Sequence, residues 1–236
     1  MMVKIRKSSE RGQTEIDWLH SRHTFSFGEY YDLRHMGFRS LRVINDDVVE
    51  PGQGFGTHPH RDMEIITVVL EGALEHRDSL GHGEVLRPGE VQVMTAGHGI
   101  RHSEFNPSRT ERVHLIQIWI LPETKGLEPA YAQKKFPASE QANALRRVAG
   151  RDDVERDGAL KIHQDADLYL ATLSAGKSLR APLRPGRGAW VHVATGAATV
   201  AGQQLEAGDA VSIESTTEFR ISGDAEVTEL VLFDLL

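Results

Sequence analysis

The 236-residue chain contains no cysteine, and this absence narrows the chemistry that it can carry. Disulfides, thiolate nucleophiles, iron–sulfur clusters and thiolate zinc sites all require cysteine. Any metal or catalytic chemistry must therefore use histidine, aspartate, glutamate or hydroxyl groups.

The chain also lacks a long apolar segment and an excess of positive charge. No apolar run approaches the roughly 20 residues that a membrane helix needs, and the polar, charged start of the chain does not resemble a secretory signal. Acidic residues outnumber basic ones by 34 to 27, which argues against direct nucleic-acid binding. We therefore expect a cytoplasmic monomer that binds neither membranes nor nucleic acids.

Helical periodicity is scarce as well. Only Ser139–Ala149 has apolar residues at helical spacing, with Ser139 as a possible cap and Gly150 as a possible end. We predict a short connecting helix there. The rest of the chain indicates strands.

Short β-branched runs separated by turn residues fill most of the sequence. Glu64–Glu71, Val91–Thr95 and Val113–Ile120 are examples, and Arg39–Asp46 is predicted as a strand that ends in a turn at Asn45-Asp46-Asp47. Strands at a spacing of roughly 8–12 residues indicate a sandwich or a barrel.

The two halves of the chain share an order of elements. A strand at 65–70, a glycine turn, a second strand and a Pro-Gly-Glu turn at 88–90 correspond to 190–194, a glycine turn, a strand and an Ala-Gly-Asp turn at 207–209. This weak repeat is typical of a double-stranded jelly roll. We predict two β domains, at residues 1–138 and 139–236.

Seven of the 12 histidines lie between positions 58 and 114, and two patterns among them are informative. His58-Pro59-His60 and His102-Ser103-Glu104 each follow a glycine-rich stretch. Residues i and i+2 of a strand face the same side, so each pair directs two potential ligands into one space. If the two strands are neighbours, three imidazoles and one carboxylate converge, a set that suits Fe(II), Mn(II), Ni(II), Cu(II) or Zn(II). Proline cannot donate to a sheet ladder, so Pro59 should lie at a strand start or edge.

Other interpretations of these residues remain open at this point. Surface strands also carry polar residues at alternate positions, and we expect surface or hydrogen-bonded structural roles for a further six histidines: His76, His82, His98, His114, His163 and His192. If the strand runs unbroken from His58, Glu64 also faces inward and competes with Glu104 for the carboxylate position. Periodicity does not choose between the two.

Gly52, His58, His60, Glu64 and Gly72 follow the first motif of the cupin superfamily with one extra residue before the last glycine, so the chain resembles this superfamily. Within it, the chain resembles the pirin family and, among pirins, the bacterial pirin-like quercetin 2,3-dioxygenases. The stretches that match pirins cover nearly the whole N-terminal half in order: His23–Phe27, Leu41–Asp46, His58–Glu64, Leu70–Gly72, Met94–Gly97, Gly99–Glu104 and Gln117–Trp119.

The resemblance implies a set of roles. It implies two cupin barrels, a bicupin, with the metal bound by His58, His60, His102 and Glu104 in the first barrel and no metal ligands in the second. Glu64 then becomes a candidate for holding one of the imidazoles in place. It implies one divalent transition metal, Fe(II) first, with Mn, Ni, Cu, Zn or Co as alternatives.

The implied activity is a metal-dependent dioxygenase that cleaves the heterocyclic ring of a flavonol such as quercetin with O2 and releases carbon monoxide. Glu104 is the candidate base, because a carboxylate at the metal is within reach of the substrate hydroxyl. Phe27, Phe38 and Phe105 are candidates for the pocket wall. The alternatives are a non-enzymatic iron-binding regulatory or redox-sensing protein that acts through a protein partner, and another cupin activity on an enol-like or aromatic substrate.

Overall fold

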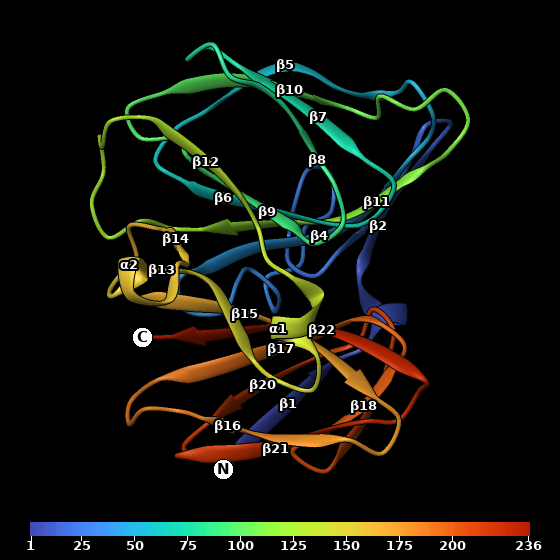
Figure 1. The fold of residues 1–236 in the computed structure, drawn as a ribbon, viewed down its shortest axis with the longest axis vertical. Coiled ribbons are helices and arrows are strands. Elements are labelled where there is room, and N and C mark those ends of the chain that lie inside the picture. The colour runs from blue at the N-terminus through green and yellow to red at the C-terminus, as the bar shows by residue number, and fades with distance from the viewer.

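The β-branched runs of the sequence form 22 short strands that close into two barrels, one above the other in Figure 1. The computed structural model describes all 236 residues. Each barrel consists of a seven-stranded and a four-stranded sheet. The predicted all-β architecture of two barrels is therefore confirmed.

The first barrel contains the candidate metal ligands. Its strands are β2 (Gly12–Ile16), β3 (Leu19–His23), β4 (Leu41–Val49), β5 (Gly54–His60), β6 (Glu64–Glu71), β7 (Leu74–Asp78), β8 (Gly83–Leu86), β9 (Glu90–Thr95), β10 (Ile100–Phe105), β11 (Val113–Ile120) and β12 (Ala130–Lys135). The seven-stranded sheet has the order β12-β9-β6-β11-β4-β3-β2, and the four-stranded sheet has the order β5-β10-β7-β8.

The second barrel repeats this plan. Its elements are β1 (Met2–Arg6), α1 (Ala138–Gln141), β13 (Arg146–Gly150), α2 (Val154–Asp157), β14 (Leu160–Lys161), β15 (Ala166–Ser174), β16 (Ser178–Pro182), β17 (Gly188–Thr195), β18 (Ala197–Val200), β19 (Gln203–Glu206), β20 (Ala210–Glu214), β21 (Glu218–Gly223) and β22 (Val227–Leu235). The sheets have the orders β1-β20-β17-β22-β15-β13-β14 and β16-β21-β18-β19. Neither helix has the length and apolar character needed to cross a bilayer.

The largest core cluster lies between the two seven-stranded sheets. Alternate residues of β11 face opposite sides: Leu115 belongs to a cluster inside the first barrel, whereas Ile116 shares a cluster with Trp190 and Phe233 of the second barrel. Burial of one such side chain contributes about 1.5–3 kcal/mol to stability. The sheet that carries part of the candidate site is therefore buried on both faces.

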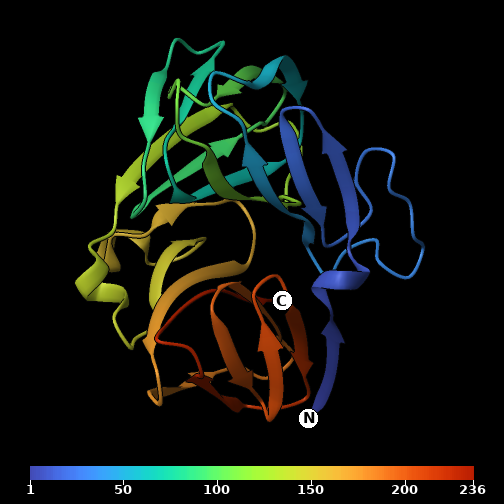
Figure 2. The same ribbon diagram turned by 90° about the vertical axis from the view of Figure 1, so that its right-hand side faces the viewer.

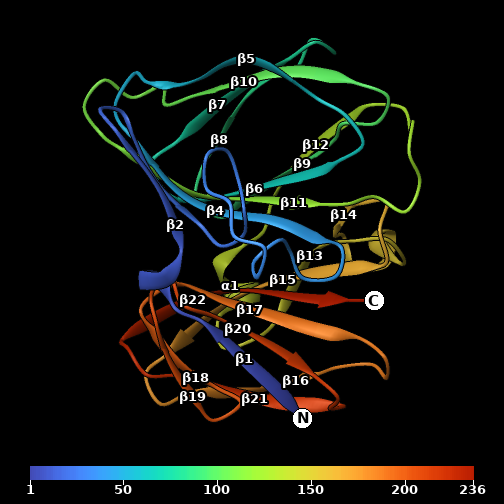
Figure 3. The ribbon, with the colours of Figure 1, turned by 180° about the vertical axis from the view of Figure 1, so that it is seen from behind.

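The first strand of the chain belongs to the second barrel. Figure 2 shows this strand beside the C-terminal strands, and Figure 3 shows it next to β20, with which it pairs antiparallel. A short 3-10 turn at Ser8–Glu10 then leads into β2 of the first barrel. The predicted first domain, residues 1–138, differs from the structure at this strand, because β1 covers the otherwise open edge of β20.

The predicted helix at Ser139–Ala149 is wrong in its extent. The connecting helix is α1 alone, since Ala142 is extended and Asn143 adopts a left-handed φ of 55°. The following residues form β13, which pairs with β15 and buries Val148 and Ala149. Two of the apolar residues that suggested one helical face, Val148 and Ala149, are thus buried by a long-range strand pairing.

Candidate metal centre

Three of the predicted metal ligands lie together inside the first barrel. β5 and β10 pair antiparallel with His102 directly opposite His58, and the strand alternation places His60 on the same face as His58. The ring centroids are 4.5 to 4.8 Å apart, and one nitrogen from each ring lies within 4.8 Å of the others. The structure therefore brings His58, His60 and His102 into one cluster.

Local features of β5 explain how it can carry these histidines. The strand is at the edge of its sheet, so the missing N–H of Pro59 costs no ladder bond on the open side, as predicted. A Cβ on Gly54 would lie 2.2 Å from the carbonyl oxygen of Glu104, so only glycine permits the close approach of β5 to β10. Nδ1 of His58 donates to the carbonyl oxygen of Gly56 at 2.8 Å, which leaves Nε2 free as a ligand atom.

Glu104, the fourth predicted ligand, adjoins the cluster with different immediate neighbours. The group of metal-capable atoms that includes Glu104 contains His76 and His102. Oε2 of Glu104 accepts a hydrogen bond from Nε2 of Gln117 at 2.8 Å, whereas Oε1 is buried and makes no hydrogen bond. Gln117 in turn accepts a hydrogen bond from the Thr67 hydroxyl at 2.9 Å. One oxygen of Glu104 is therefore held in place and the other is available.

His76 lies behind His102 and orients it. Nε2 of His76 is 3.1 Å from Oδ2 of Asp78, and its Nδ1 is 3.4 Å from Nδ1 of His102. An ionised carboxylate only accepts, so Nε2 of a neutral His76 carries the proton and its Nδ1 accepts from His102. Nε2 of His102, which is buried and has no hydrogen-bond partner, is then left with its lone pair. This is the tautomer that a metal ligand needs.

The electrostatics of the cluster favour neutral imidazoles. Burial, together with repulsion from His102 and His58, lowers the pKa of His60 to about 4. Burial, with smaller contributions from His58 and His76, lowers the pKa of His102 to about 3. Both rings therefore keep free lone pairs at neutral pH. Several imidazole nitrogens and a buried carboxylate oxygen without partners are a donor set that suits a divalent transition metal.

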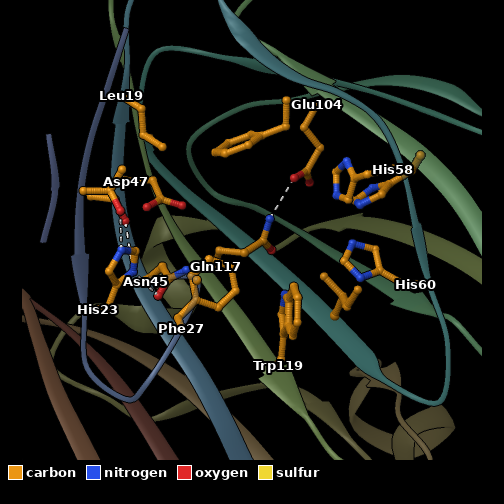
Figure 4. Close-up of a pocket in the computed structure, with 16 residues that line it drawn as sticks. Leu19, His23, Phe27, Asn45, Asp47, His58, His60, Glu104, Gln117 and Trp119 are labelled. Atoms are coloured by element: carbon orange, nitrogen blue, oxygen red, sulfur yellow. Dashed lines mark hydrogen bonds between the residues drawn. The ribbon is translucent and has the colours of Figure 1, made fainter. Parts of the chain in front are cut away.

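A cavity of about 190 Å³ adjoins these residues (Figure 4). Its wall includes the imidazoles of the cluster and Glu104, and its apolar part is made by Leu19, Phe27, Phe55, Ile65 and Trp119. The ring of Trp119 lies against that of His60, with centroids 4.9 Å apart. The centre therefore opens into a pocket that suits a planar aromatic molecule.

The three phenylalanines expected at the pocket lie in different environments. Phe27 lines the cavity. Phe38 packs against Trp190 of the second barrel, with ring centroids 5.6 Å apart, and Phe105 is exposed. Phe55 and Trp119 also line the cavity, although an aromatic residue in a strand gives no local sign of a cavity in the sequence.

Glu64 lies away from the histidine cluster. The strand breaks after His60, where Asp62 adopts a left-handed φ of 50°, so the parity argument from His58 does not extend to Glu64. Its carboxylate accepts a hydrogen bond from Thr95 at 2.9 Å and lies 3.5 Å from Nδ1 of His163. The expectation that it holds an imidazole of the cluster is not supported by these contacts.

The other histidines have the expected kinds of environment with one exception. His76, His82 and His114 are hydrogen-bonded to aspartates, and His98 is an exposed residue beside Glu128. His192 is fully buried, and neither of its ring nitrogens has a hydrogen-bond partner. The prediction of a surface or hydrogen-bonded role is wrong for His192.

The polar residues of β4 were missed as part of the site. The predicted turn at Asn45-Asp46-Asp47 is wrong, because all three residues lie inside β4. Asn45 and Asp47 line the cavity, whereas Asp46 faces the other side and pairs with Arg11 and His114. Val43, Asn45, Asp47 and Val49 occupy every second position and therefore share one face of a strand. This spacing was the available signal for a strand with a polar segment.

Both halves of the chain match known protein families. Residues 4–120 match the family model described as Pirin, and residues 148–235 match the one described as quercetinase C-terminal cupin domain. The chain is 48% identical over 234 residues to a protein of Escherichia coli K12 named quercetin 2,3-dioxygenase, covering 99% of each chain.

Solved structures show the same similarity. The crystal structure of YhhW from E. coli superposes with a TM-score of 0.94 at 48% identity, covering 100% of this chain and 98% of that one. The structure of the bacterial pirin YhhW in complex with nickel(II) superposes with a TM-score of 0.93 at 48% identity, covering 99% of both chains.

Proposed function

Because this chain belongs to the pirin family, we propose that it is a metal-dependent dioxygenase of the quercetin 2,3-dioxygenase type. The proposed reaction cleaves the heterocyclic ring of a flavonol with O2 and releases carbon monoxide. The observation that carries the proposal is the cluster of His58, His60 and His102 at the wall of an aromatic-lined pocket.

The residues present fit a divalent metal. His58, His60 and His102 supply three nitrogens, and the buried, unpartnered Oε1 of Glu104 supplies an oxygen. A bound divalent ion lowers the pKa of a coordinated hydroxyl, which favours the enolate form of a flavonol. We propose Fe(II) as the native metal, with Mn, Ni, Cu, Zn and Co as alternatives. The nickel complex of the E. coli relative supports binding of such ions here.

The chain's own groups bind the substrate and accept its proton. The rings of Phe27, Phe55 and Trp119 hold a planar molecule and exclude water from the histidine end of the pocket. Gln117 holds the carboxylate of Glu104 in place by a hydrogen bond to Oε2, and this carboxylate accepts the proton of the substrate hydroxyl. Glu104 is thus proposed both as a ligand and as the base.

The test is aerobic incubation of the metal-reconstituted protein with quercetin, with carbon monoxide and loss of flavonol absorbance as readouts. The negative control is the double variant His58→Ala/His60→Ala, and the matched control is His98→Ala, which removes an exposed histidine outside the site. We expect turnover in the wild type and in His98→Ala only. No turnover above the double variant with any of Fe, Mn, Ni, Cu, Zn or Co would overturn the dioxygenase proposal.

A further inference from the structure

The cavity beside the metal centre has a second polar end. Figure 4 shows His23, Asn45 and Asp47 on the side opposite His58 and His60. The cavity wall also includes five apolar side chains, those of Leu19, Phe27, Phe55, Ile65 and Trp119. Polar groups buried inside a barrel reduce its stability unless they find partners. Polar groups at this end that lack a partner within the protein would be satisfied by a ligand with polar groups at both of its ends.

Asp47 provides a buried carboxyl group in the cavity wall. The residue is 3% exposed, and its Oδ1 is buried with no hydrogen bond. Burial raises the pKa of Asp47 to about 7, although the neighbouring Ser21 hydroxyl acts in the opposite direction. An unpaired buried carboxyl oxygen costs stability in the free protein. A ligand that donates a hydrogen bond to the carboxyl group of Asp47 would reduce this cost.

Asn45 provides a donor on the same face of β4, two residues before Asp47. Its Oδ1 accepts a hydrogen bond from Nδ1 of His23 at 2.9 Å, and Nε2 of His23 accepts one from the Thr14 hydroxyl at 2.8 Å. These contacts fix the amide, and its Nδ2 donates no hydrogen bond within the protein. A free donor next to a free acceptor is complementary to a hydroxyl group, which both donates and accepts.

We propose that Asn45 and Asp47 form a hydroxyl-binding subsite that selects substrates with a hydroxyl on the ring remote from the metal-binding edge. The ligand class is a planar polyphenol, in which one phenolic hydroxyl donates to the carboxyl group of Asp47 and accepts from Nδ2 of Asn45. This inference rests on the proposed function for the other end of the molecule, the chelating edge at the histidine cluster. A site that leaves polar groups unpaired discriminates against an analogue without the hydroxyl.

The test compares two flavonols that share the chelating edge. Quercetin carries hydroxyls on its remote rings, and 3-hydroxyflavone carries none. Dissociation constants are measured with nickel-loaded protein under nitrogen by quenching of tryptophan fluorescence, so that binding is read without turnover. We expect the wild type to bind quercetin about tenfold more tightly than 3-hydroxyflavone, the effect of one buried hydrogen bond with an unpaired partner.

Variants separate the subsite from general damage to the pocket. Asp47→Ala is expected to weaken quercetin binding about tenfold and to leave 3-hydroxyflavone unchanged. Asp47→Asn retains an acceptor oxygen and should keep most of the selectivity. Asp17→Ala, at an exposed position, serves as the matched control.

The outcomes distinguish this inference from the proposed function. Equal affinity for both flavonols in the wild type, or an equal loss of both in Asp47→Ala, would overturn the subsite alone. If neither flavonol binds the nickel-loaded wild type, both the subsite and the proposed function are wrong.

Discussion

The imidazoles of His76 and His102 lie with their Nδ1 atoms 3.4 Å apart, and Asp78 holds the far side of His76. Burial acts to raise the pKa of Asp78, but hydrogen bonds from His76, from His82 and from the backbone N–H of Leu80 together lower it. Because the carboxylate of Asp78 only accepts, Nε2 of His76 donates to it, and Nδ1 of His76 accepts the hydrogen bond from His102.

Asp78→Asn is the variant that tests this relationship. An amide N–H in place of Oδ2 would force the proton of His76 onto Nδ1, and His102 would then carry its proton on Nε2, the atom needed for the metal. We expect metal affinity to fall about 10- to 100-fold, measured by competition with a chelating dye. Arg77→Gln, an exposed neighbour on the same strand, is the control. Unchanged affinity in Asp78→Asn would show that His76 does not orient His102.

Thr67→Val tests the polar contacts behind Glu104. Valine keeps the shape of threonine but leaves Oε1 of Gln117 buried without its donor. We expect a loss of about 1–3 kcal/mol in the free energy of unfolding, measured by urea denaturation at an unchanged m-value. Thr110→Val, at an exposed position, should have no effect. Equal midpoints for the wild type and Thr67→Val would contradict the prediction.

Metal removal should destabilise the protein. A ligand present at about 1,000 times its dissociation constant stabilises the folded state by about 4 kcal/mol. We therefore expect a chelator to lower the melting temperature of the metal-loaded wild type in a calorimetric scan. The variant His58→Ala/His60→Ala should melt at the same temperature with and without chelator. A chelator effect of equal size in both proteins would place the stabilising metal elsewhere.

His192 should make stability depend on pH. Burial lowers its pKa to about 3, whereas an unfolded histidine titrates near about 6.5. Between these values only the unfolded chain binds the proton, so stability falls as the pH drops below about 6.5, by up to about 1.4 kcal/mol per pH unit for this group.

The variant His192→Leu removes this titration. Between about pH 7 and about pH 5.5, metal-free His192→Leu should lose about 1 kcal/mol less stability than the metal-free wild type, measured by urea denaturation. His98→Leu, at an exposed position, should show the same pH dependence as the wild type. If the His192→Leu and wild-type curves run parallel, the imidazole is already charged in the folded protein.

Strands with strong local signals were predictable from the sequence. β6 and β11 occupy the residues expected for them, because runs rich in β-branched residues between turn residues indicate strands. The pairing of His58 and His60 on one face also follows from strand alternation alone. These features depend only on residues close together in the chain.

Features that depend on distant contacts were not predictable. Asparagine and aspartate are typical turn residues. Asn45 and Asp47 lie in a strand instead, with side chains that face the cavity, and the sequence does not reveal that cavity. The position of Glu64 depends on one left-handed residue, Asp62, and the strand at Val148 depends on pairing with β15. The roles of Gln117 and His76 follow from neighbours that the fold brings together.

The pairing of β1 with β20 also affects how the protein is made. β1 leaves the ribosome before every other strand of this chain, and β20 follows about 200 residues later. At roughly 5–20 residues per second, β1 waits roughly 10–40 s for its partner, while all strands of the first barrel are completed. Lys4 and Arg6 give the waiting strand positive charges, which discourage pairing with strands of other nascent chains.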